Sequence, residues 1–108
     1  MPKYLLEVNY TLDGARGLGA EGGTARVAAA TALVESLGGK VESFYFALGD
    51  TDAYVVIELP NNSSAAAGAL AVNIGGGATA RTVALLTAAE VDDSVAAVKK
   101  ATYRPPGS

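Results

Sequence analysis

The hydrophobic positions of this chain alternate between the spacing typical of strands and the spacing typical of helices. Over residues 3–10 the side chains alternate between two faces, which predicts a strand. From Thr24 the apolar positions recur every three to four residues, which predicts a helix that ends at Gly38-Gly39. The remaining pattern predicts strands over 40–48, 53–59 and 78–86, a helix over 65–74, and a last helix with Thr87 as its N-cap.

The order of these elements, βαββαβ followed by a helix, is that of the ferredoxin-like α+β arrangement with a four-stranded antiparallel sheet. Right-handed crossovers place both main helices on one face of that sheet. The glycine-rich stretch 14–23 predicts a loop, and the nearly charge-free helix 65–74 is expected to be buried on most sides. We expect a single domain over residues 1–101 and an extended tail over 102–108.

The predicted sheet is apolar on both faces, although the helices cover only one of them. In the strand 53–59, Val55, Ile57 and Leu59 lie on one side, and Tyr54 and Val56 lie on the other. A large apolar sheet face in water is costly, and a second copy related by a two-fold axis is the simplest cover. The pattern therefore predicts a homodimer built sheet against sheet, with the size of any higher oligomer left open.

Composition excludes several classes of site. The chain has 108 residues, enough for one domain, and it contains no Cys and no His. Thiol nucleophiles, disulfides and Ser-His-Asp triads are therefore excluded, and we expect no metal site and no cofactor. A net charge of −3 and the absence of a long apolar run argue against nucleic acid and membrane as partners. The composition is typical of a small bacterial cytoplasmic protein.

Two polar segments each have a functional and a structural interpretation. In Gly49-Asp50-Thr51-Asp52 the two carboxylates are placed to bind a cation or to act as acid and base, but the same residues favour a tight turn. In Glu21-Gly22-Gly23-Thr24-Ala25-Arg26 the glycines, Thr24 and Arg26 stand where a helix start attracts an anion, and ordinary capping by Thr24 is the alternative.

Polar side chains also interrupt the predicted strands. Buried charges need partners, so either Glu7 or Glu58 is expected to pair with Arg81. Such a pair has two interpretations: it holds an acidic or phenolic ligand together with a tyrosine, or it lies at a solvated strand end or in a dimer interface. The tail segment Tyr103-Arg104-Pro105-Pro106-Gly107 likewise either docks on a neighbouring subunit or is a mobile end.

Several segments together resemble the GYD domain family of small bacterial proteins. The resemblance runs along nearly the whole chain and implies the dimeric α+β barrel superfamily. The motif that names the family, Gly-x-Tyr-Asp, differs here because Thr51 stands at the aromatic position. The segments that carry the resemblance are Met1-Pro2-Lys3-Tyr4-Leu5-Leu6, Glu21-Gly22-Gly23-Thr24-Ala25-Arg26, Leu37-Gly38-Gly39-Lys40, Phe44-Tyr45-Phe46, Gly49-Asp50 with Asp52, Leu85-Leu86-Thr87 and Tyr103-Arg104-Pro105-Pro106-Gly107.

Members of this superfamily include cofactor-free monooxygenases, muconolactone-isomerase-like enzymes and ligand-sensing domains, with a cavity between the sheet and the helices or loops. The resemblance implies a homo-oligomer that binds a small organic ligand in each subunit. The sequence does not decide whether the protein is an enzyme. For a cofactor-independent isomerase or monooxygenase, the candidate base, orienting group and anion clamp are Tyr45, Asp52 and Arg81. The candidate ligand-binding residues are Glu7, Tyr54, Glu58, Arg81, Thr24 and Arg26.

The alternative to ligand binding is a non-catalytic structural or assembly module. It is favoured by the alanine-rich helix beginning at Ala65, since alanines allow close approach of helices but supply no chemistry. An enclosed pocket lined by polar groups would favour ligand binding, and an interior filled by side chains would favour assembly.

Overall fold

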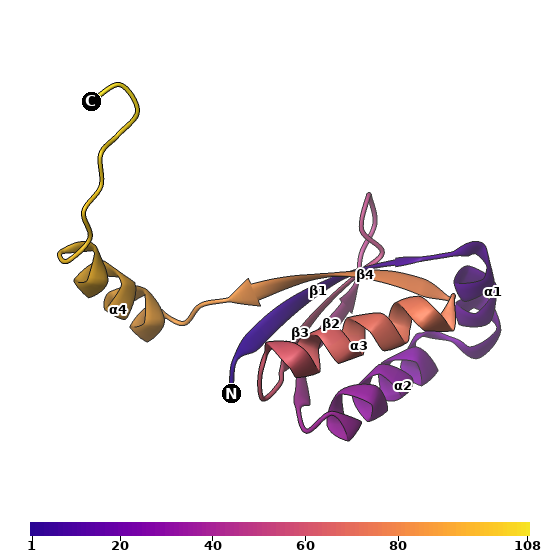
Figure 1. Ribbon diagram of the computed structural model, residues 1–108. Helices are drawn as coiled ribbons and strands as arrows, with labels where there is room; N and C mark the ends of the chain where they lie inside the picture. The colour runs from indigo at the N-terminus through magenta and orange to yellow at the C-terminus, as the bar shows by residue number, and fades with distance from the viewer.

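A computed structural model describes residues 1–108 and contains four strands and four helices, shown in Figure 1. In chain order the elements are β1 (Lys3–Tyr10), α1 (Leu12–Glu21), α2 (Gly23–Ser36), β2 (Lys40–Phe46), β3 (Ala53–Glu58), α3 (Asn62–Gly75), β4 (Ala78–Leu85) and α4 (Ala88–Val98). None of the helices combines the length and the apolar character that a membrane crossing requires.

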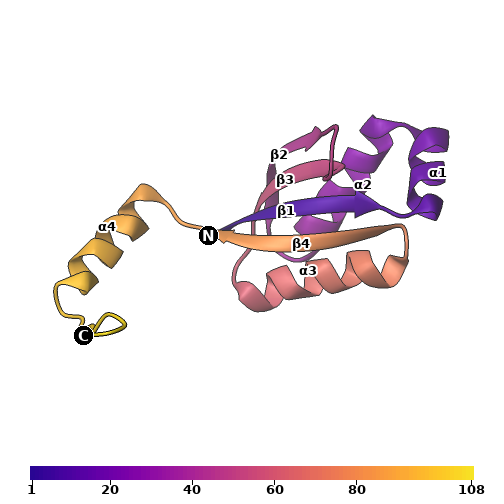
Figure 2. The ribbon, with the colours of Figure 1, turned by 90° about the horizontal axis from the view of Figure 1, so that it is seen from above.

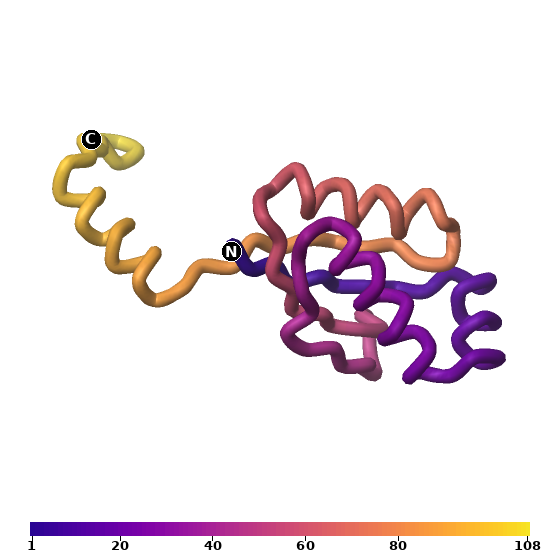
Figure 3. Tube along the Cα trace, turned by 90° about the horizontal axis from the view of Figure 1, so that it is seen from below, coloured from indigo at the N-terminus to yellow at the C-terminus, as the bar shows by residue number.

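The sheet has the strand order β2-β3-β1-β4, with every neighbouring pair antiparallel (Figure 2). Both α2 and α3 lie against the same face, side by side in the view from below (Figure 3). This confirms the ferredoxin-like α+β arrangement. We call the face without helices the open face.

The core lies between the sheet and these two helices. Alternate residues of β1 and β3 point into it, with Tyr4, Val55 and Ile57 almost completely buried. Val34 from α2 and Ala65 from α3 close the core from the helix side. Burial of these apolar side chains is the main force that holds the layers together.

The ends of the helices follow the predicted signals. Gly38 and Gly76 both adopt positive φ, +85° and +78°, directly after α2 and α3, where a side chain would be strained. Thr87 forms a capping box with Glu90 at the start of α4, because each side chain bonds the other residue's backbone N–H.

The predicted loop over residues 14–23 is wrong, because Leu12–Glu21 form the helix α1. The side chain of Thr11 caps this helix by accepting a hydrogen bond from the Gly14 N–H. Thr11 also donates its backbone N–H to the Gly77 carbonyl and its hydroxyl to that of Gly76. These tertiary bonds stabilise a helix that its glycines alone would disfavour.

Two expectations about neighbouring elements are also corrected. The strand expected to reach residue 48 ends at Phe46. Helix α3 begins at Asn62 rather than at residue 65, because the Asn61 side chain accepts a hydrogen bond from the Ser64 N–H at 2.9 Å.

Helix α3 is not buried on most sides, contrary to the prediction. Ala65 is its only buried residue, while the side chains of Leu70 and Ile74 are 59% and 81% exposed. The reason is geometric: the sheet covers one side of α3, and no other part of this chain reaches the opposite side. Its outer side is therefore an apolar surface without a charged residue.

Helix α4 extends away from the rest of the fold and packs on no other element (Figures 1 and 2). The radius of gyration is 17.3 Å, whereas a compact domain of this length is expected near roughly 13 Å. The tail after α4 contains no helix or strand and, like α4, lies apart from the sheet (Figure 1). In a single chain, α4 and the tail form an arm.

Candidate functional site

A cavity of about 390 Å³ lies between α1, α2, α3 and the edge where β1 ends and β4 begins. This volume falls within the range of small-molecule sites. The polar groups in its wall come from Tyr10, Glu21 and Arg26. Residues with little or no side chain form much of the remaining wall: Gly14, Gly17, Ala29, Ala71, Gly75, Gly77 and Ala78.

The cavity exists because of the position of α1. Gly14 lies directly against the turn between α3 and β4, and a Cβ atom there would come within 1.7 Å of the Gly77 carbonyl oxygen. At Gly17, by contrast, a Cβ atom would meet nothing within 4 Å. One glycine of α1 thus permits contact with the body of the fold, and the other leaves the cavity open.

A second hollow of about 460 Å³ shares Tyr10 and Leu18 with the first. Its wall is mainly apolar, with Phe46 and Ala47 from the end of β2 and the loop that follows it. Asp52 supplies the one charged group. The two hollows therefore meet around the last residue of β1.

The hydroxyl of Tyr10 is buried and forms no hydrogen bond of good geometry, although the Arg26 guanidinium lies close enough to act on it as a charge and as a hydrogen-bond donor. Burial raises the pKa of this hydroxyl, the nearby Arg26 guanidinium lowers it, and the Asp52 carboxylate raises it, with burial the largest effect. Tyr10 is therefore protonated at neutral pH and able to donate a hydrogen bond. A buried polar group without a partner is costly, and such groups are concentrated where function requires them.

Arg26 lies near the N-terminus of α2 and contributes to the wall of the first cavity. Its guanidinium takes part in none of the ion pairs of the protein. The N-cap of α2 is Gly22, and no side chain caps it, so the interpretation in which Thr24 caps this helix is wrong. Thr24 is exposed on the first turn of α2, outside both hollows.

The segment from Gly49 to Asp52 is held against the end of β1 by several hydrogen bonds. Asp52 Oδ2 accepts from the Tyr10 backbone N–H at 2.9 Å, and the Asp52 N–H donates to the Val8 carbonyl at 2.9 Å. The Asn9 amide donates to the carbonyl of Asp50 at 3.0 Å. These bonds are those of an ordered turn, and they also fix the Asp52 carboxylate at the second hollow.

Thr51, which occupies the aromatic position of the family motif, is buried. Its hydroxyl oxygen accepts a hydrogen bond from Arg81 Nη2 at 3.3 Å. Thr51 thus supplies an oxygen that connects this turn to β4.

Glu7 and Arg81 face each other across β1 and β4, with Arg81 Nε 3.6 Å from Glu7 Oε2. Both residues lie on the open face. Tyr54 on β3 and Tyr45 on β2 lie on the same face and are opposite each other in the register of these two strands. Tyr45 is 72% exposed. The predicted pairing of Glu7 with Arg81 is present, and it belongs to the open face, on the far side of the sheet from the cavity.

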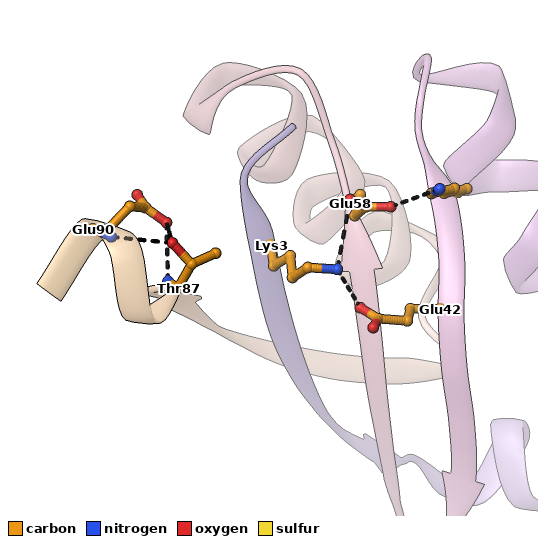
Figure 4. Close-up of polar contacts among 6 residues, drawn as sticks. Lys3, Glu42, Glu58, Thr87 and Glu90 are labelled. Atoms are coloured by element: carbon orange, nitrogen blue, oxygen red, sulfur yellow. Dashed lines mark hydrogen bonds and ion pairs between the residues drawn. The ribbon is translucent and has the colours of Figure 1, made fainter. Parts of the chain in front are cut away.

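Glu58 pairs with lysines instead of Arg81, at the other end of the open face (Figure 4). Its carboxylate lies 3.1 Å from Lys40 Nζ and 3.5 Å from Lys3 Nζ, and Lys3 also pairs with Glu42 at 2.7 Å. The hydrogen bond from Lys40, with help from Lys3, lowers the pKa of Glu58, and the hydrogen bond to Glu42 raises the pKa of Lys3. This network keeps one end of the open face polar.

The structure separates the three residues considered for catalysis. Asp52 lies at the second hollow, under the face that carries the helices, whereas Tyr45 and Arg81 lie on the open face. Of the residues considered for ligand binding, Arg26 lines the cavity, and Glu7, Tyr54, Glu58 and Arg81 lie along the open face. Within one chain, these residues form two separate groups.

Sequence reasoning did not identify Tyr10 as a site residue. Its place in the alternating pattern of β1 indicates only that it faces the helices. Whether its hydroxyl finds a partner depends on α1, the helix that the glycine pattern predicted as a loop. Only a correct prediction of helix α1 could have indicated that a cavity lies next to Tyr10.

Comparison with known proteins gives one match. The model of the GYD domain matches residues 4–95 of this chain, which is most of its length. The comparisons with curated proteins and with solved structures found no match.

Proposed function

Because this chain belongs to the GYD domain family, we propose that it binds a small organic ligand in the cavity beneath α1 and that it does so as a homo-oligomer. The carrying observation is Tyr10, which lines both hollows and whose buried hydroxyl forms no hydrogen bond of good geometry. A polar group in that position gains a partner when a ligand enters.

The construction of the cavity supports ligand binding over a filled interior. Its walls are glycines and alanines that leave volume unoccupied by side chains, together with a few polar groups that orient a ligand. Glycines within a helix weaken that helix relative to alanine. At Gly17 a Cβ atom would meet nothing within 4 Å, so a larger side chain can be introduced beside the cavity without a clash.

A cavity-filling variant tests this proposal. We would titrate isotope-labelled protein with naphthylacetamide and follow the backbone amide signals of Tyr10, Leu18 and Arg26. The expected result is a saturable shift of these signals that Gly17→Leu abolishes. Gly19→Leu is the matched control, because Gly19 lies in the same helix, lines neither hollow and has equally open space around it. Binding that survives in Gly17→Leu would place the ligand elsewhere.

The open face supports the homo-oligomer. Across its middle, Val56, Leu5 and Val83 stand side by side on β3, β1 and β4. Above that face rises the loop between β2 and β3, with a fully exposed Leu48 (Figure 1). We propose that a second copy packs sheet against sheet on this surface, since a contiguous row of apolar residues that is half-buried or exposed in one chain favours further burial.

The arm formed by α4 also favours assembly, the second candidate function. Val91, Val95 and Val98 form an apolar stripe along α4, and all three are exposed because the helix packs on nothing in its own chain. The capping box stabilises this helix locally, and propensity alone rarely stabilises so short a helix in water. We therefore propose that α4 packs on the second copy and extends the sheet-to-sheet interface.

The measurement for assembly is the molar mass in solution from light scattering or sedimentation. We expect a dimer or a multiple of it, weakened by replacing Val91, Val95 and Val98 together with serine. The matched control replaces Ala89 and Ala96 with serine, because these two lie on the opposite side of α4. A stable monomer at micromolar concentration would contradict the proposed assembly and leave the cavity proposal standing.

A further inference from the structure

Arg26 is the one cationic group in the walls of the two hollows. The Arg26 guanidinium carries only donors and takes part in no ion pair. The Tyr10 hydroxyl is buried and forms no hydrogen bond of good geometry. An occupant of this cavity that brings acceptors would therefore pair with both groups.

From this unpaired cation near the Tyr10 hydroxyl we infer that the ligand is an organic monocarboxylate with an apolar body, its carboxylate bound by Arg26 and Tyr10. The inference rests on the proposed ligand-binding function and adds the chemical class of the ligand. A guanidinium matches the two oxygens of a carboxylate with two parallel N–H groups. The Tyr10 hydroxyl donates to the same group.

The acidic residues of the site restrict the ligand to one negative charge. Asp52 lies at the second hollow, with Oδ2 already accepting the Tyr10 backbone N–H at 2.9 Å. Glu21 lies in the wall of the first cavity, exposed to solvent and not paired with Arg26. A second carboxylate on the ligand would face one of these anions, and Arg26 is the only cation in either wall.

The body of the ligand is expected to be apolar. Apart from Asp52 and the Tyr10 hydroxyl, the second hollow presents Leu18, Phe46 and Ala47. Gly23 lies so close to the Phe46 ring that a Cβ atom there would be 3.1 Å from Cε2. This ring is therefore packed against the start of α2, where it forms a firm apolar wall.

The test compares probes that share one skeleton and differ in charge. Naphthylacetate, naphthylacetamide, naphthylethylamine and naphthylmalonate carry a single negative, a neutral, a positive and a double negative group. With the full-length protein at neutral pH, amide-shift titrations give the affinity of each. We expect naphthylacetate to bind at least about tenfold more tightly than the amide, as one charge-assisted bond would provide. The amine and the malonate are expected to bind more weakly than naphthylacetate.

Arg26→Gln tests the residue itself. We expect this change to lower the affinity for naphthylacetate about tenfold, to the level of the amide, and to leave the affinity for the amide unchanged. Arg16→Gln is the matched control, since Arg16 lies on α1 and lines neither hollow. Tyr10→Phe should weaken naphthylacetate and leave naphthylethylamine, which offers no acceptor to the hydroxyl, unchanged.

The outcomes separate the two proposals. Equal binding of acid, amide and amine, all abolished by Gly17→Leu, would overturn the carboxylate class and leave the ligand-binding function intact. Tightest binding of the amine or the malonate would overturn it as well. If none of the four probes shifts the amide signals around the cavity, the proposed function and the ligand class both fail.

Discussion

Gly14 of α1 lies so close to Gly77, at the turn before β4, that a Cβ atom on Gly14 would come within 1.7 Å of the Gly77 carbonyl oxygen. The contact is between two stretches of backbone, and the Thr11 N–H donates to the same carbonyl at 3.1 Å. A flexible side chain could move aside, but backbone held on both sides cannot. This approach fixes α1 above the cavity.

Gly14→Ala should therefore destabilise the fold and detach α1. We expect a loss of about 1–3 kcal/mol in the free energy of unfolding, the range for overpacked sites. Gly17→Ala, one turn further along the same helix, should instead stabilise the protein by up to about 1 kcal/mol through helix propensity. Urea denaturation of both variants checks the expectation, and similar effects from the two changes would contradict the backbone contact.

The buried hydroxyl of Tyr4 should contribute to stability through Asn62. Tyr4 is 2% exposed, and its hydroxyl donates to Asn62 Oδ1 at 2.6 Å, which connects β1 to the first turn of α3. Tyr4→Phe is expected to cost about 1 kcal/mol in the free energy of unfolding. The control is Tyr45→Phe, because the Tyr45 hydroxyl forms no hydrogen bond in the structure and its side chain is largely exposed. Equal losses in the two variants would refute this role.

Ionisation of Tyr10 should lower the stability of the protein as the pH becomes alkaline. Its folded-state pKa is raised from the ordinary value of 10.0, chiefly by burial. The contribution of the neutral hydroxyl is fully present below pH 10 and is lost as the pH rises through the raised pKa. Denaturation of wild type and Tyr10→Phe between neutral and alkaline pH isolates this effect, because the lysines titrate alike in both proteins. A constant difference in stability across that pH range would show that the pKa of Tyr10 is unchanged by folding.

The capping box should control how much of α4 is helical. Removing the Thr87 hydroxyl, as in Thr87→Ala, leaves the Glu90 N–H without its acceptor and should cost about 1 kcal/mol of local helix stability. Ser94→Ala removes a hydroxyl that bonds only within the helix, to the Glu90 carbonyl, and should leave helicity unchanged or slightly higher. Chemical shifts of residues 88–98 report the result.

Acid should weaken the same helix. The hydrogen bonds from Thr87 lower the pKa of Glu90 from 4.5. The carboxylate's contribution is therefore present above pH 4.5 and is lost as the pH falls through the lowered pKa. Glu90→Gln should remove this acid dependence, and helicity that falls equally with acid in both proteins would contradict it.

The strands and the two main helices were predictable because their signals are local. Alternation in β1 and β3 is set by which residues the core buries, and the glycines after α2 and α3 are needed for positive φ. The Thr87 capping box also depends on residues only a few positions apart. These particular predictions, each based on residues a few positions apart, were confirmed.

Helix α1 could not be predicted in this way. Its glycines favour a loop when propensity alone is considered, and the bonds that hold it come from Gly76 and Gly77, more than sixty positions away. The error extended to the candidate site, because Tyr10 gains its significance only from the helix above it. The prediction that α3 is buried on most sides was wrong for a related reason. An apolar pattern indicates which surface of a helix favours burial, but within a single chain only one side of α3 is covered by other residues.

By itself, the amino-acid sequence determined the order of the four strands and of the helices other than α1, the sheet face that holds the core, and the absence of histidine and cysteine chemistry. Periodicity and composition carry these properties, since each depends on neighbouring residues or on none. Only the tertiary structure decided that Arg26, Asp52 and Tyr10 surround connected hollows, while Arg81 and Tyr45 lie across the sheet. The physical reason is that alternation places a side chain on one side of its strand, whereas what it meets there depends on long-range packing that no local pattern encodes.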